Sequence, residues 1–177
     1  YHFDTRAIHE GLKDTSWQGA TLPPIFQTAA HHHGSADSLS KTFAGKTQEH
    51  IYMRLSNPTN RFLEQKLASL ESGAAAVVTG SGMAAINNAC MTLLRSGDEF
   101  VASKSLFMSS YSLFTTIFKK YGINVKLVDP LNLDDIEQSI NEKTRFVYVE
   151  TITNPGMEIA DIKNIAKLCH TNGIPLL

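Results

Sequence analysis

The stretch that decides the fold is AAAVVTGSGMAA, residues 74–85. It begins as a short apolar run, passes through the turn Gly80–Gly82 and continues from Met83 in helical register. This pattern predicts a strand over residues 74–79, a tight glycine turn and the start of a helix. Such a turn presents unpaired backbone N–H groups at the positive end of a helix dipole, so we expect a phosphate to bind there.

After residue 56 the sequence alternates between segments of strand character and segments of helical character. Asn57 and Pro58 suit a helix cap and a first helical turn, and Gly73 is expected to end that helix. Further helices are expected at 83–95, 110–121, 134–140 and 159–171, and strands at 74–79, 99–103, 124–128, 145–149 and 174–177. Such alternation predicts an α/β fold with a mostly parallel sheet and helices on both faces.

Residues 1–56 lack a sustained helical or strand period. Polar residues, glycine and the Pro23-Pro24 pair dominate, with isolated apolar residues such as Ile25 and Phe26. So long a segment without regular structure is unusual inside a compact domain. We therefore expect residues 1–56 to form an N-terminal arm that packs on a neighbouring subunit. The remainder, residues 57–177, is expected to be an incomplete domain, because it stops within an apolar strand.

The composition restricts the class of protein. Hydrophobic residues are 42% and charged residues 19% of the 177, as in an ordinary folded domain. A net charge of −1 argues against nucleic acid as the main partner, and no apolar run approaches the roughly 18 residues of a membrane span. Cys90 and Cys169 lie far apart in helical patterns, which predicts free thiols and a reducing, cytoplasmic location. The adjacent His31, His32 and His33 lack partners at other spacings, so no metal site is expected.

The glycine turn leaves two classes of phosphate ligand open. Residues 80–85 fit the G-x-G-x-x-G/A pattern of a dinucleotide-binding domain. That ligand also needs an acid after the second strand, to bind a ribose hydroxyl. Asp98 and Glu99 have about the right separation but precede that strand, whereas Lys104 and Ser105 follow it. A dinucleotide is therefore the second-ranked ligand.

Four segments point to a different ligand when they are taken together. In chain order they are Tyr52-Met53-Arg54 with Asn57-Pro58-Thr59-Asn60, then Ser81-Gly82-Met83-Ala84-Ala85, then Ser105-Leu106-Phe107-Met108-Ser109-Ser110, and then Glu150-Thr151-Ile152-Thr153-Asn154-Pro155. These segments resemble the Cys/Met-metabolism family of pyridoxal-phosphate enzymes, which have the aspartate-aminotransferase-like fold (fold type I). The resemblance covers nearly the whole chain and is closest to the O-acetylhomoserine sulfhydrylase branch. It implies that residues 57–177 are the N-terminal part of the large, cofactor-binding domain.

The resemblance implies a site for pyridoxal 5'-phosphate. Backbone amides of Ser81, Gly82 and Met83 would hold its phosphate, in agreement with the helix-terminus argument. The arm would donate Tyr52 and Arg54 to the phosphate of a neighbouring subunit. Arginine suits this role because it forms two parallel hydrogen bonds with a phosphate.

The resemblance also assigns residues to the cofactor ring. Phe107 would stack on the pyridine ring. Many family members have tyrosine there, so a proton-transfer role of that hydroxyl is absent from this chain. Asn154 would hydrogen-bond the phenolic oxygen, with Glu150 as a supporting neighbour.

The catalytic groups of the family are not found in this sequence. No Ser-x-Thr-Lys segment matches the Schiff-base lysine, which is therefore expected beyond Leu177. The aspartate that pairs with the pyridinium nitrogen and the arginine that holds the substrate carboxylate are expected there too. Lys104 does not match the family lysine and is expected to be a surface charge.

The implied function is γ-replacement on O-acetylhomoserine with sulfide or a thiol, which gives homocysteine or methionine. The expected assembly is a homotetramer built from dimers that share active sites. Methionine γ-lyase and cystathionine γ-synthase are the alternatives within the family. A non-catalytic cofactor-binding fragment and a dinucleotide-binding dehydrogenase domain are alternatives of other classes.

Overall fold

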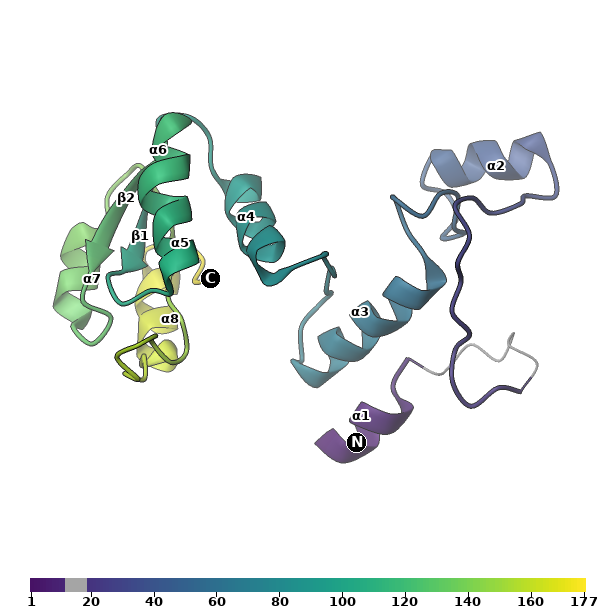
Figure 1. Cartoon of the computed structure of the whole chain (residues 1–177), viewed down its shortest axis with the longest axis horizontal. Helices are drawn as coiled ribbons and strands as arrows, with labels where there is room; N and C mark the ends of the chain where they lie inside the picture. Colours follow the sequence, from purple (N-terminus) through teal and green to yellow (C-terminus); the bar gives the residue numbers. More distant parts are fainter. Residues whose placement is uncertain (12–18) are drawn as a thin grey trace. The chain divides into compact units, whose positions relative to one another are not determined.

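The computed structural model describes residues 1–11 and 19–177, which form two compact units (Figure 1). The first unit spans Tyr1–Val78 and the second spans Thr79–Leu177. The first helix after residue 56 therefore groups with the N-terminal segment rather than with the sheet. The role of residues 1–56 as an arm on a neighbouring subunit stays a prediction, and residues 12–18 of that arm lie outside the described residues.

A parallel sheet with strand order β2-β1-β3 forms the centre of the second unit. Its strands are β1 (Glu99–Ser103), β2 (Asn124–Val128) and β3 (Thr144–Tyr148). The pairing of β1 with β2 keeps one register throughout, whereas its pairing with β3 shifts between Glu99 and Val101. Leu176 continues the sheet through a parallel bridge to Val147. The predicted parallel sheet is thus confirmed.

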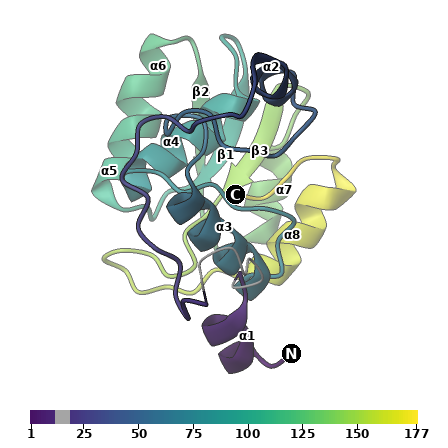
Figure 2. The same ribbon diagram turned by 90° about the vertical axis from the view of Figure 1, so that its right-hand side faces the viewer.

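Helices cover both faces of this sheet, as the alternation of segments predicts. One face is covered by α4 (Gly82–Leu93) and by a continuous helix, which consists of α5 (Met108–Ser112), the π-helical η1 (Leu113–Ile117) and α6 (Phe118–Lys120). The other face is covered by α7 (Leu133–Ser139) and α8 (Ile162–Thr171). Figure 2 shows α4, α5 and α6 on one side of β1 and β3, with α7 and α8 on the other. Neighbouring residues of a strand point to opposite faces, so Phe100 and Val101 belong to two separate core clusters.

Aromatic side chains dominate the core between the sheet and the helix that contains η1. The ring centroid of Phe100 lies 5.0 Å from that of Phe114 and 4.8 Å from that of Phe146. Phe114 also meets Tyr148 edge-on, at 4.9 Å. Complete burial of one such ring contributes about 1.5–3 kcal/mol. The cluster therefore fixes this helix, and the loop that leads into it, over the sheet.

The cysteines lie in these cores as free thiols, as predicted. Cys90 and Cys169 are both completely buried, one in each cluster. Burial raises the pKa of Cys90 to about 12 and also raises that of Cys169. Separately, no helix among the described residues is long and apolar enough to cross a membrane.

The described residues of the first unit form three helices, and two of them contradict the prediction for residues 1–56. They are α1 (Phe3–His9), α2 (Ala36–Phe43) and α3 (Pro58–Leu70). The sequence predicted no regular structure where α1 and α2 form, because helices of 7 and 8 residues are shorter than the window in which a helical period is read. α1 packs against α3, where Arg6 Nη1 donates to the Ser69 carbonyl.

Helix α3 begins as predicted but ends one residue earlier than expected. Asn57 is its cap, since Asn57 Oδ1 accepts the Thr59 N–H at 2.9 Å. At the other end Ser72, not Gly73, adopts the left-handed conformation, with φ 56°. The Gly73 N–H then donates to the Ala68 carbonyl at 2.8 Å, which completes a Schellman motif.

The strand predicted over residues 74–79 does not form. No described strand pairs with this segment, and Val77 is 82% exposed. The Val78 N–H donates instead to Glu64 Oε1 at 3.1 Å. A strand needs a neighbour for its backbone N–H and C=O groups, and a local apolar run does not reveal whether that neighbour is present.

Candidate functional site

The N-terminus of α4 lies at the carboxyl edge of the parallel sheet. α4 ends at Leu93, and the chain soon reaches the amino end of β1, where the Gly97 N–H donates to the Gly122 carbonyl at 2.8 Å. Ile86 and Cys90 pack against the core beside β1, so α4 runs antiparallel to that strand. Ligands of open α/β sheets bind at the carboxyl edge, which places the glycine turn where a ligand is expected.

The first turn of α4 offers free backbone donors. Ser81 caps the helix: its Oγ accepts the Ala84 N–H, and its carbonyl accepts the Ala85 N–H, both at 3.1 Å. The N–H groups of Ser81, Gly82 and Met83 donate to no other described residue. A Cβ added at Gly82 would meet nothing within 4 Å, so the chain is not crowded at the start of this helix. This is the arrangement that binds a phosphate at a helix N-terminus.

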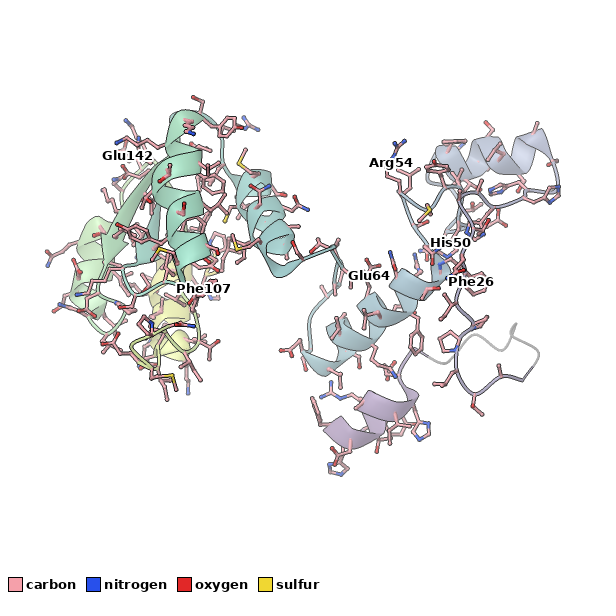
Figure 3. All side chains as sticks on the ribbon, viewed as in Figure 1. Phe26, His50, Arg54, Glu64, Phe107 and Glu142 are labelled. Atoms are coloured by element: carbon pink, nitrogen blue, oxygen red, sulfur yellow. The ribbon has the colours of Figure 1, made fainter. Side chains whose placement is uncertain are left out.

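Phe107 lies at the same edge, at the position that precedes α5. Its side chain is 48% exposed, and its backbone N–H lies 3.2 Å from both carboxylate oxygens of Glu150. Glu150 follows β3 and Phe107 follows β1, so the contact joins the carboxyl ends of two neighbouring strands. Figure 3 shows Phe107 at the end of the second unit opposite Glu142, which precedes β3. A half-exposed ring at this edge can stack on a flat ligand.

Asn154 lies in the loop between β3 and α8, which buried Thr153 organises. The Thr153 N–H donates to the Glu158 carbonyl and the Glu158 N–H donates to Thr153 Oγ1, both at 2.9 Å, while Ile152 bridges Ile159. Asn154 itself is exposed. Its side-chain amide has no hydrogen bond to any residue that the structure describes. The loop therefore presents a free amide donor on the chain that follows β3.

Tyr52 and Arg54 lie in the first unit, at the start of a turn that precedes α3, in which the Leu55 N–H donates to the Tyr52 carbonyl at 2.8 Å. Tyr52 forms an antiparallel bridge with Ala30, and Met53 N–H donates to the Ala29 carbonyl at 2.9 Å. Both side chains are exposed. Their place at the site, like that of the other predicted site residues, stays a prediction.

Lys104 is held as a surface ion pair rather than as a reactive amine. Its Nζ lies 2.7 Å from Asp129 Oδ2, and the two residues follow β1 and β2. The hydrogen bond that Lys104 donates to the Asp129 carboxylate holds the pKa of Lys104 above its ordinary value. A lysine that attacks a carbonyl must lose its proton, so this environment opposes such a role and supports the surface-charge interpretation.

The histidines form polar contacts within the first unit. The rings of His31 and His50 lie 5.4 Å apart, His50 Nδ1 lies 2.8 Å from Ser56 Oγ, and His33 Nδ1 lies 3.2 Å from Glu49 Oε2. The pKa of His50 is lowered mainly by burial, and further by the charges of His31 and Arg61, in that order. Across the described residues, no group of three or more His, Cys, Asp or Glu side chains is placed to hold a metal ion.

These groups fit a flat cofactor that carries a phosphate. Three free N–H groups at a helix N-terminus suit the phosphate, the exposed face of Phe107 suits an aromatic ring, and the amide of Asn154 suits a ring oxygen. Their placement at the carboxyl edge of a parallel sheet is that expected for the fold-type-I class that the sequence resembles, whose members bind pyridoxal phosphate.

Comparison with known proteins identifies the family. A model of the family described as Cys/Met metabolism PLP-dependent enzyme matches residues 4–177. The chain therefore belongs to the Cys/Met metabolism PLP-dependent enzymes, whose cofactor is pyridoxal 5'-phosphate.

Individual relatives have several activities. The chain is 40% identical over 172 residues to an L-methionine gamma-lyase of Fusobacterium nucleatum subsp. polymorphum, covering 97% of this chain and 43% of that protein. It is 34% identical over 176 residues to a homocysteine synthase of Schizosaccharomyces pombe, covering 99% and 41%. The chain also resembles a solved structure assigned as an O-acetylhomoserine (thiol)-lyase of Campylobacter jejuni, with a TM-score of 0.94 and 31% identity. The match covers 99% of this chain and 43% of that chain, and that structure carries a pyridoxyl-lysine phosphate group. The chain thus spans less than half of the length of these relatives.

Sequence reasoning missed how closely Glu150 and Phe107 are connected. The sequence placed Glu150 only as a neighbour of the site, whereas its carboxylate accepts the Phe107 N–H directly. An acid immediately after one strand and an exposed aromatic residue after the adjacent strand were the available signal. The strand order was needed to pair them, and a single sequence does not supply it.

Proposed function

We propose that the full-length protein catalyses γ-replacement on O-acetylhomoserine with sulfide or a thiol, giving homocysteine or methionine. The proposal rests on the free backbone N–H groups at the start of α4 and on the half-exposed ring of Phe107, which lie at the carboxyl edge of the sheet. It also rests on the likeness of the chain to an O-acetylhomoserine (thiol)-lyase, with a TM-score of 0.94. A relative named homocysteine synthase supports the same reaction class.

The residues of this chain have separate tasks in the proposed enzyme. The N–H groups of Ser81, Gly82 and Met83 bind the phosphate through charge-assisted hydrogen bonds. Phe107 covers one face of the cofactor ring and excludes water from it. Asn154 donates a hydrogen bond to the phenolic oxygen and so fixes the orientation of the ring.

When bound, the cofactor would supply an electron sink. The protons on Cα and Cβ could then leave, acetate could depart from Cγ, and the sulfur of sulfide or a thiol could form its bond to that carbon. Phe107 has no hydroxyl, so it neither accepts nor delivers a proton in these steps. Its contribution is to hold the ring, and proton transfer falls to other groups of the enzyme.

We also propose that each site is shared between two subunits of a homotetramer in the cytoplasm. Tyr52 and Arg54 from one subunit complete the phosphate site of its neighbour. The exposed guanidinium of Arg54, which forms no ion pair with any residue that the structure describes, supports this proposal, because a bidentate phosphate ligand needs free N–H groups.

Methionine γ-lyase is the second candidate function, because a relative with that name is 40% identical to this chain. An assay of the full-length holoenzyme separates the two. Sulfide-dependent release of acetate from O-acetylhomoserine, with formation of homocysteine, supports γ-replacement. Release of ammonia and 2-oxobutyrate from methionine alone supports the lyase.

A spectroscopic test addresses the cofactor itself. The proposed enzyme shows a visible absorption band that borohydride removes, with the cofactor then fixed to a lysine. A protein that lacks this band and binds a nicotinamide dinucleotide tightly would instead be a dehydrogenase domain, and the proposal would fail.

A further inference from the structure

We propose that Glu150 is a positioning residue that fixes where Phe107 presents its ring at the carboxyl edge of the sheet. The proposal rests on the proposed function, in which Phe107 stacks on the cofactor. It goes further by assigning the control of that ring to a carboxylate 43 residues away in the chain.

The contact is made to the backbone of Phe107. Its N–H lies 3.2 Å from Glu150 Oε1 and 3.2 Å from Oε2, so one donor is shared between the two carboxylate oxygens. The Phe107 carbonyl accepts the Tyr111 N–H at 3.0 Å, in the first turn of α5. The residue is thus held on one side by its own helix and on the other side by Glu150.

The ring of Phe107 is only half covered by other residues. It is 48% exposed, and no aromatic contact involves it among the residues that the structure describes. Packing therefore holds this ring only in part, so its position depends on the backbone that carries it. Loss of the Glu150 acceptor therefore releases the ring as well as the N–H group.

Both carboxylate oxygens of Glu150 take part in this contact, so substitutions that remove one or both of them test it. Glutamine keeps one acceptor oxygen but replaces the other with a donor, so it retains part of the hydrogen bonding. Alanine removes both oxygens. Substitution at Glu142 provides a matched control, because Glu142 is an exposed glutamate at the opposite end of the sheet (Figure 3).

The experiment compares E150A and E150Q with E142A and E142Q in the full-length holoenzyme. We expect E150A to keep its cofactor content but to lose much of the visible circular dichroism per bound cofactor. We expect kcat to fall about tenfold with little change in KM, since one hydrogen bond to a charged group is removed. E150Q is expected to be intermediate. An E150A enzyme whose circular dichroism and kcat match those of E142A would overturn the proposal.

A double-mutant cycle with Phe107→Ala tests whether Glu150 acts through Phe107. If it does, E150A has no further effect on kcat once the ring is absent. An E150A effect of equal size in both backgrounds contradicts the positioning role while leaving the proposed function intact. A Phe107→Ala enzyme with unchanged circular dichroism and kcat contradicts the proposed stacking role itself, and with it this proposal.

Discussion

The guanidinium group of Arg54 lies over the ring of Tyr52, with its central carbon 5.4 Å from the ring centroid. Both residues are exposed on the turn that follows the Ala30–Tyr52 bridge, and Figure 3 shows the Arg54 side chain projecting away from the ribbon. Arg54 forms no ion pair within the part of the chain that the structure describes. A guanidinium that stacks on a ring keeps its N–H groups free, so Tyr52 orients Arg54 for an anion.

Arg54→Ala is therefore expected to weaken cofactor retention by about tenfold to a hundredfold in the full-length enzyme, the range for hydrogen bonds to a charged group. Arg54→Lys keeps the charge but loses the two parallel bonds, so it should fall between wild type and Arg54→Ala. Dialysis against buffer, followed by absorbance of the remaining cofactor, measures the effect. Arg95→Ala, at an exposed arginine before β1, is the control. Unchanged retention in Arg54→Ala would contradict the phosphate role.

Sharing of sites between subunits predicts complementation between two defective variants. Arg54→Ala and Asn154→Ala damage opposite halves of a shared site, so a mixed dimer contains one intact site and one doubly damaged site. Half of the randomly mixed dimers are heterodimers with one intact site of two, so mixing should add about a quarter of wild-type activity to what the two parents retain. If the mixture is no more active than the average of the two parents, then Arg54 either serves the site of its own subunit or does not belong to the site at all.

The pairing of His31 with His50 predicts that acid loosens the segment that carries Tyr52. The His50 pKa is lowered from 6.5 by burial, by His31 and by Arg61, so the folded segment binds fewer protons than the unfolded one. Its stability should fall as the pH drops below 6.5 toward the lowered pKa. Hydrogen exchange at the amides of His31 and Met53, which donate across the Ala30–Tyr52 bridge, reports the opening.

The substitution His50→Gln removes this titration and serves as the comparison. It should flatten the pH dependence of exchange between pH 7 and pH 5 at both amides. Equal pH dependence in wild type and His50→Gln, after correction for intrinsic exchange rates, would rule out His50 as the origin.

The sequence predicted the elements whose signals are local. The strands at 99–103 and 124–128 have the predicted bounds, and Asn57 caps its helix as its residue type indicates. The strand at 74–79 was predicted from its own apolar run, but a strand also needs a partner, which is not a local property. The helix expected at residue 110 begins at Met108 and contains a π-helical turn, in which Phe114 is completely buried and which no local sequence signal indicated.

Chemical modification should find both cysteines inert in the folded protein. Burial raises the pKa of Cys90 to about 12, and Cys169 is also completely buried. At pH 8 the thiolate fraction of Cys90 is about a thousandfold lower than that of an ordinary thiol, and burial also blocks the reagent. A disulfide reagent should therefore label neither residue in buffer and both in denaturant. Rapid labelling of Cys90 under native conditions would show that the α4 core opens readily.

The glycine turn permits a substitution that removes one phosphate donor while keeping the helix. Gly82 is the first residue of α4, a position where proline is well tolerated, and the preceding Ser81 is extended, with φ −162° and ψ 159°, as a residue before proline should be. Gly82→Pro should therefore keep the circular dichroism of the helices but weaken phosphate and cofactor binding by about tenfold, because a free N–H is lost. Gly82→Ala retains that N–H and places its Cβ in open space, so it is the matched control. Equal affinity in the two variants would mean that the Gly82 amide does not bind the phosphate. Equally weak binding in both would instead indicate that the ligand approaches the backbone too closely for any side chain at this position.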